Sequence, residues 1–103
     1  MFARLTSFSI LPEKLEDAKR IYNEEVIPVV RQQKGNIGVW LLEPTKSEND
    51  YISLTEWTSE ADANAYHSGG TYQKLVDKLK DMFAGKAVLK TYNVAETKIT
   101  VPM

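Results

Sequence analysis

The sequence predicts a single α+β domain, in which an antiparallel sheet of four strands carries helices on one of its faces. Three observations lead to this prediction. The chain has 103 residues, which leaves room for one modest core. Four short segments show the alternation or the apolar runs of strands, and amphipathic helical patterns separate the first from the second and the third from the fourth. This order is the split βαβ pattern of ferredoxin-like domains.

Composition limits the classes of protein and of partner. The 43% hydrophobic and 26% charged residues are typical of a globular domain, and the absence of cysteine excludes disulfides and thiolate metal sites. Thirteen basic and fourteen acidic residues form no basic cluster, so nucleic acid is not an expected partner. No apolar run approaches the roughly 20 residues that cross a bilayer, and the first residues lack a secretory signal pattern. We therefore expect a cytoplasmic protein without a membrane partner.

The first strand is expected over Phe2–Ile10, where large apolar and small polar residues alternate until Leu11-Pro12 ends the ladder. A helix is expected over Glu13–Gln33, with Pro28 kinking its last turns and Gly35 ending it. Its apolar positions recur at three- and four-residue steps on one face: Leu15, Ala18, Tyr22, Val26, Val29 and Val30.

The second and third strands are expected over Ile37–Glu43 and Tyr51–Trp57. The polar segment 44–50 between them is short enough to make an antiparallel hairpin. Both strands are apolar on both faces, so both faces of the sheet should be covered.

The second half of the chain predicts two helices and a last strand. Ser59 should cap a short helix over Glu60–Tyr66, which Gly69-Gly70 breaks. Thr71 should cap the next helix, whose stripe is Tyr72, Leu75, Val76, Leu79, Met82 and Phe83. The fourth strand is expected over Ala87–Val94.

The whole of 1–103 is expected to be one domain, with 95–103 as a C-terminal tail in which Ile99 and Val101 could pair with a strand. Two helices can cover only one face of a four-stranded sheet. The other face would then expose a large apolar patch, which a monomer in water rarely tolerates. We therefore expect a homodimer that pairs through this face.

Two stretches resemble the antibiotic biosynthesis monooxygenase (ABM) family. Glu24–Gly35 followed by Gly38–Leu42 is similar to its first helix and second strand, and Leu54–Ala63 with Tyr66 and Tyr72 after it is similar to the region that follows. With the order of elements, the likeness extends from about Phe2 to Val94. It implies a dimeric α/β barrel with a ligand cavity in each subunit between sheet and helices. The family includes oxygenases without metal or flavin, haem-degrading enzymes and proteins with no assigned reaction.

The resemblance gives Trp57 a catalytic role, because polyketide-oxidising members carry a pocket tryptophan at this place. The alternative is a core tryptophan at the end of a strand. Those members also have a pocket asparagine four residues before the tryptophan and a tyrosine six residues after it. Ser53 and Ala63 occupy these places here, which departs from the polyketide-oxidising pattern.

The haem-degrading members carry an asparagine on strand one, a tryptophan in the short helix and a histidine ligand in the next helix. Aligned with them, these places hold Thr6, Tyr66 and Val76, so no iron ligand remains. The resemblance therefore implies a protein that uses no haem, and we expect no metal and no other cofactor. Thr6 and Ser53 are predicted to contact a ligand together with Tyr66 and Tyr72.

His67 is the only histidine and the candidate general base, since its charge changes near neutral pH. The alternative is a solvated residue at the end of a helix. Tyr66 and Tyr72 have their own alternative, as members of an apolar core stripe. Glu56 could face inward with a raised pKa, but we interpret it as paired across the dimer seam.

Two functional classes follow from these residues. The first is a cofactor-independent monooxygenase, in which the deprotonated form of a small aromatic or quinol-like molecule reduces dioxygen in an apolar cavity. The second is a dimeric protein that binds a small molecule, or has only a structural role, without catalysis. A cavity that reaches both Trp57 and His67 would favour the enzyme.

Overall fold

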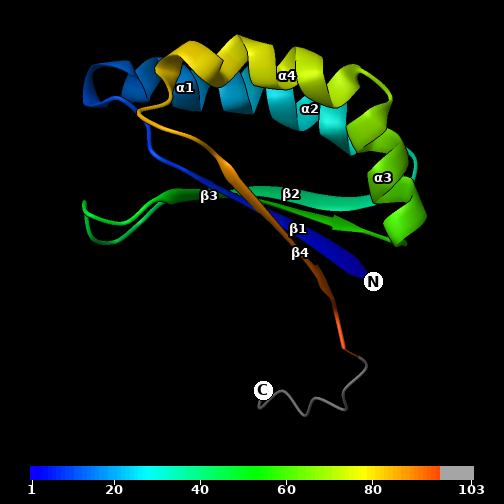
Figure 1. Cartoon of the computed structure of the whole chain (residues 1–103). Helices are drawn as coiled ribbons and strands as arrows, with labels where there is room; N and C mark the ends of the chain where they lie inside the picture. The colour runs from blue at the N-terminus through cyan, green and yellow to red at the C-terminus, as the bar shows by residue number, and fades with distance from the viewer. Residues whose placement is uncertain (96–103) are drawn as a thin grey trace, which may run out of the picture.

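The computed structural model describes residues 1–95, which form a four-stranded sheet with helices along one face (Figure 1). The strand order is β2-β3-β1-β4, and every neighbouring pair is antiparallel. This confirms the predicted α+β ferredoxin-like class. The strands are β1 (Phe2–Phe8), β2 (Asn36–Leu42), β3 (Tyr51–Trp57) and β4 (Val88–Asn93).

The helical segments form the layer above the sheet in Figure 1. None of those within residues 1–95 has the length and apolar character needed to span a bilayer. In chain order they are η1 (Pro12–Lys14), α1 (Leu15–Ile21), η2 (Tyr22–Val26), α2 (Ile27–Arg31), α3 (Glu60–Ser68), α4 (Thr71–Leu79) and η3 (Lys80–Met82).

The first helix is irregular next to Pro28, the residue at which a kink was predicted. The π-helical turn η2 precedes this proline, and in it the Ile27 N–H bonds to the Tyr22 carbonyl. Pro28 follows at once and has no N–H for the carbonyl of Glu24, which an α-helix would require. Widening the preceding turn accommodates that missing donor, as π-helical turns often do. The turn also carries Tyr22 and Val26 to the buried side of the helix.

The N-terminal caps of α3 and α4 were both predicted, and one of the two predictions is confirmed. The Ser59 hydroxyl accepts the Asp62 N–H at 3.2 Å, so the predicted cap of α3 is confirmed. The predicted cap of α4 is wrong, because Gly70 and not Thr71 occupies that position. Gly70 has φ +91°, a left-handed conformation that glycine adopts without strain, and this lets the chain turn directly from α3 into α4.

The core lies between the sheet and the helices and is centred on Trp57. Its side chain is 0% exposed, its indole N–H donates to the Thr55 hydroxyl at 2.9 Å, and its ring stacks on Tyr66 at 5.1 Å. Around it the core contains Phe2, Ala18, Tyr22, Val26, Val30, Ala63, Leu75 and Leu79.

Within residues 1–95, no helix lies on the opposite face of the sheet (Figure 1). Trp40 on β2 is 45% exposed, and Val88 and Tyr92 on β4 are each 50% exposed. Gly38 lies directly beneath the Trp40 indole, where a Cβ atom would collide with the ring. The expected fourth strand is one residue shorter at each end, and the predicted pairing of Ile99 and Val101 lies outside the described residues.

Replacing Trp57 by alanine tests the position of this core. The indole is fully buried, and truncating a large buried aromatic leaves a cavity, so we expect Trp57→Ala to lower the free energy of unfolding by about 3–5 kcal/mol. Urea denaturation followed by circular dichroism measures this. A loss below about 1 kcal/mol would show that the indole does not occupy the core.

Candidate active site

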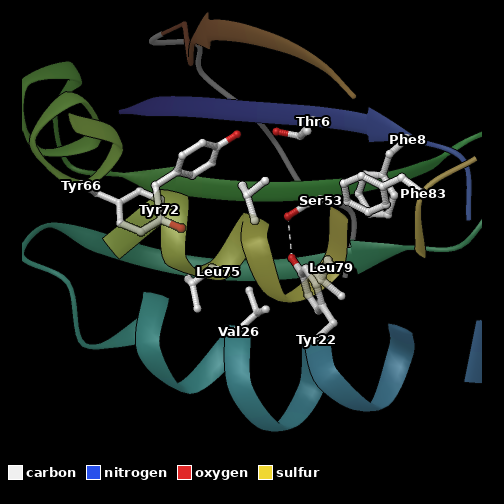
Figure 2. A pocket seen from close by; sticks show the side chains of 11 residues that line it. Thr6, Phe8, Tyr22, Val26, Ser53, Tyr66, Tyr72, Leu75, Leu79 and Phe83 are labelled. Atoms are coloured by element: carbon white, nitrogen blue, oxygen red, sulfur yellow. Dashed lines mark hydrogen bonds between the residues drawn. The ribbon is translucent and has the colours of Figure 1, made fainter. Parts of the chain in front are cut away.

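A hollow of about 80 Å³ lies between the sheet and α4 (Figure 2). The centres of β1 and β3 form one wall, and α4 with the π-helical turn η2 forms the other. Its lining is mostly apolar or aromatic: Thr6, Phe8, Tyr22, Val26, Ser53, Tyr66, Tyr72, Leu75, Val76, Leu79 and Phe83.

Short side chains in the middle of the sheet leave this space open. Thr6 on β1 and Ser53 on β3 are direct cross-strand partners, and both line the hollow. The Tyr22 hydroxyl from η2 bonds to the Ser53 hydroxyl at 2.6 Å and donates to the Trp40 carbonyl at 3.3 Å. With Tyr66 and Tyr72, the apolar hollow therefore has five hydroxyl-bearing side chains in its lining.

Aromatic rings close both ends of the hollow, as Figure 2 shows. At one end Tyr66 and Tyr72 meet edge to face, with ring centres 5.7 Å apart and planes at 86°. At the other end Phe8 and Phe83 lie 4.8 Å apart. Burial raises the pKa of the Tyr66 hydroxyl to about 12, so this group stays protonated near neutral pH and can donate a hydrogen bond.

Arg4 lines a second hollow of about 40 Å³, which shares both tyrosines and both short side chains with the first. The arginine is only 5% exposed. Its guanidinium lies 5.0 Å from the centre of the Tyr72 ring and 5.7 Å from that of Tyr66. Burial lowers the pKa of Arg4, while the two tyrosines act in the opposite direction. An arginine still keeps its proton at physiological pH, so a permanent positive charge adjoins the hollow.

Arg4 is bonded to the candidate base. A nitrogen of the guanidinium lies 2.5 Å from Nδ1 of His67. Because arginine carries only donors, Nδ1 must accept this bond, and the neutral ring then carries its proton on Nε2. Burial, and next the charge of Arg4, lower the pKa of His67. The imidazole also stacks on Tyr72 at 4.4 Å between ring centres.

The predicted site residues divide into two groups. Thr6, Ser53, Tyr66 and Tyr72 line the hollow together. Trp57 stacks on Tyr66 in the core, and His67 is an exposed residue near the end of α3 that bonds to Arg4; neither is part of the lining of the two hollows.

Sequence reasoning missed Arg4 and Tyr22. The signal for Arg4 was present in the alternation of β1, because Phe2, Arg4, Thr6 and Phe8 share one parity. A charged residue between two large apolar residues of that face is expected to point inward. Periodicity placed Tyr22 on the buried face of the first helix, but nothing in the sequence marked its hydroxyl as part of a site.

The residues at this site do not match a metal or haem centre. Residues 1–95 contain no group of three histidine, cysteine, aspartate or glutamate side chains that could hold a metal ion. Val76, aligned above with the histidine ligand of the haem-degrading members, lines the hollow with a side chain that cannot bind iron.

A wider hollow of about 440 Å³ lies on the other face of the sheet, at the turn between β2 and β3. Its lining is mostly that exposed turn and includes no aromatic ring: Ser7, Leu42, Glu43, Pro44, Thr45, Asn49, Asp50 and Ile52. The smaller hollow under α4 is therefore the better candidate for an aromatic ligand.

Comparison with known proteins agrees on one family. The family model described as antibiotic biosynthesis monooxygenase matches residues 1–78. No curated protein gave a significant match.

Solved structures share the fold at low sequence identity. A protein from Deinococcus radiodurans assigned to the antibiotic biosynthesis monooxygenases superposes with a TM-score of 0.84 at 13% identity, over 99% of this chain and 100% of that chain. A protein with the same assignment from Nitrosomonas europaea superposes with a TM-score of 0.79 at 17% identity, over 93% of this chain and 100% of that chain. A mutant of MhuD, with two manganese protoporphyrin IX molecules bound per active site, superposes with a TM-score of 0.78 at 18% identity, over 97% of this chain and 100% of that chain.

The pH dependence of stability should contain a contribution from His67. Its pKa is lower in the folded protein than the ordinary value of 6.5, so the unfolded chain binds the proton more tightly. This contribution is complete above that ordinary value and is lost as the pH falls through the folded-state pKa.

Between about pH 7.5 and pH 5 the wild type should therefore lose more unfolding free energy than His67→Gln, which keeps an acceptor but does not titrate. Urea denaturation at both pH values measures the difference. An equal loss in the two proteins would contradict the assigned geometry of the histidine.

Proposed function

The chain belongs to the antibiotic biosynthesis monooxygenase family, and from this we propose that it is a monooxygenase of a small aromatic or quinol-like molecule that uses dioxygen alone. The observation that carries the proposal is the hollow itself. It combines aromatic and aliphatic walls with hydroxyl groups that can orient a ring substituent.

The size of the hollow favours a ligand with one ring. Pockets for drug-sized molecules have volumes of roughly 300–1,000 Å³, whereas this hollow has about 80 Å³. Tyr72, half-buried at one end, is the side chain that a larger ligand would have to displace.

The proposed reaction needs no reactant besides the quinol and dioxygen. Loss of a phenolic proton gives an anion, which supplies electrons to dioxygen. One oxygen atom then replaces a ring hydrogen and the other leaves as water, while the quinol becomes a hydroxylated quinone. The quinol loses four electrons in total, two in forming the new C–O bond and two in becoming a quinone, and these reduce dioxygen completely. The protein's part is to hold the ring, accept the proton and exclude water.

We propose that Nδ1 of His67 accepts the phenolic proton of the substrate, on a condition set by the contact of this nitrogen with Arg4. This nitrogen accepts a hydrogen bond from Arg4, so it is free to take a proton only when that bond is released. Trp57, which stacks on Tyr66 without lining the hollow, would act as a positioning residue that holds the tyrosine in place.

The proposal does not include haem, although one structural neighbour carries a manganese porphyrin. The only histidine of the chain is bonded to Arg4 and lies outside the lining of the hollow, and Val76 stands in the wall. Haem chemistry would need a ligand that these side chains do not supply.

A second function is favoured by the same contacts. With Nδ1 of His67 engaged by Arg4, neither hollow is lined by a free base. A protein that binds an aromatic molecule without transforming it would have the same walls and would need no base.

Oxygen uptake separates these two functions. With metal-free protein and a panel of hydroquinones and hydroxylated naphthalenes, we expect turnover that His67→Ala lowers by roughly a hundredfold, the usual contribution of a general base. Lys74→Ala, an exposed change on α4, should leave turnover unaltered. Saturable binding without oxygen uptake would favour the binding protein.

We also propose that two copies pair through the sheet face that carries no helix. Trp40, Leu42, Val88 and Tyr92 are large apolar side chains exposed on this face, on the edge strands β2 and β4, and exposed apolar surface of this kind marks an interaction surface. Glu56 lies on the same face and could pair across the seam.

Introducing a charge on this face tests the dimer. Wild-type protein should sediment as a dimer at micromolar concentration, because a specific interface buries on the order of 800 Å² per partner. Trp40→Glu should give monomers, while Lys74→Glu on the helical side should leave the dimer intact. A wild-type monomer under these conditions would exclude the proposed interface.

A further inference from the structure

We propose that Arg4 makes the hollow an anion-binding site, in which the guanidinium pairs with a negatively charged oxygen, carboxylate or phenolate, of the aromatic ligand. The inference rests on the proposed function only in placing a ring between the sheet and α4. It adds the chemical class of the ligand and a residue that the family assignment does not provide.

Arg4 has no acidic partner among residues 1–95. The ion pairs among residues 1–95 join Lys19, Arg20, Lys78 and Lys80 to acidic side chains, and none includes Arg4. A buried charge is normally paired, because its removal from water is costly. Arg4 is 5% exposed and keeps its charge, so the described chain leaves this requirement unmet.

The neighbours of the guanidinium on the sheet and on the helices include no acidic side chain. On the sheet its cross-strand neighbours are Thr55 on β3 and Thr91 on β4, which carry no charge. From the helices it meets Tyr66, Tyr72 and His67. None of these three side chains is a carboxylate, so the site is a single positive charge enclosed by hydroxyl, imidazole and aromatic groups.

The charge of Arg4 lies beside the hollow. Arg4 lines the smaller hollow, which shares Tyr66 and Tyr72 with the larger one. A ring packed against these tyrosines can therefore reach the guanidinium with an oxygen substituent. Arginine presents its N–H donors in a fork that matches a carboxylate, and it also binds a single phenolate oxygen.

Pairing of Arg4 with the ligand would also release Nδ1 of His67, which the proposed base requires. An anionic oxygen bound to Arg4 competes with Nδ1 of His67 for the same N–H groups. Once the ligand holds the guanidinium, Nδ1 is released and can accept a proton. The ligand would thus prepare the base by occupying its partner.

A purely structural role for Arg4, with its guanidinium against two tyrosine rings, is the alternative that the experiment has to exclude. The probes are benzoate and benzamide, which share size and shape but differ in charge. Binding to the full-length wild-type protein is followed by calorimetry and tryptophan fluorescence. We expect benzoate to bind about tenfold or more tightly than benzamide, as a charge-assisted hydrogen bond predicts.

Two variants assign that preference to Arg4. Arg4→Met removes the charge at similar length and should abolish the preference for benzoate while benzamide binding persists. Arg4→Lys keeps the positive charge and should retain part of the preference for benzoate. If Arg4→Met does not fold, the comparison of the two probes on wild-type protein still decides the question.

The absorbance of 4-nitrophenol gives an independent measurement, because its phenol and phenolate forms differ in colour. Bound to wild-type protein its pKa should fall below that of the free compound, and in Arg4→Met this shift should vanish. Equal binding of benzoate and benzamide with no such shift would overturn the anion site and leave the proposed function standing. Failure of all three probes to bind would overturn both.

Discussion

The alternation of β1 is the constraint on which the candidate site depends. It sends Phe2, Arg4, Thr6 and Phe8 to the face of the sheet that the helices cover. The two phenylalanines are buried and anchor the strand at its ends, whereas the short Thr6 leaves space beneath α4. Arg4 places a positive charge at the edge of that space. A shift of one residue would exchange this set for Ala3, Leu5 and Ser7 and remove both the space and the charge.

The same alternation makes the sheet serve two purposes. Its covered face packs the core around Trp57 and keeps a small hollow, while its other face presents Trp40 on β2 and Val88 and Tyr92 on β4. Gly38 supports that second face, because only a residue without a Cβ lets the Trp40 indole lie against the strand. A ligand site and a proposed dimer surface are thus separated by the thickness of one sheet.

Periodicity predicted the sheet, its hairpin, and α3 and α4, because these elements follow from local alternation and amphipathic spacing. It could not predict the π-helical turn before Pro28 or the cap at Gly70, which depend on backbone geometry. The family resemblance led to four residues that line the hollow. An aligned position alone does not show whether a side chain lines a pocket or packs behind one that does. Trp57, which was predicted to be catalytic, packs behind Tyr66, and Arg4 was not predicted as a site residue.

Arg4 connects the ligand and the base in the proposed mechanism. Its guanidinium holds His67 in the free protein and would bind an anion in the complex. A crystal structure of the protein with bound 4-hydroxybenzoate tests this most directly. We predict the ring between β1 and α4, the carboxylate on the guanidinium, and Nδ1 of His67 separated from it. A guanidinium already paired with a carboxylate of the protein itself, or a ligand bound elsewhere, would contradict the account.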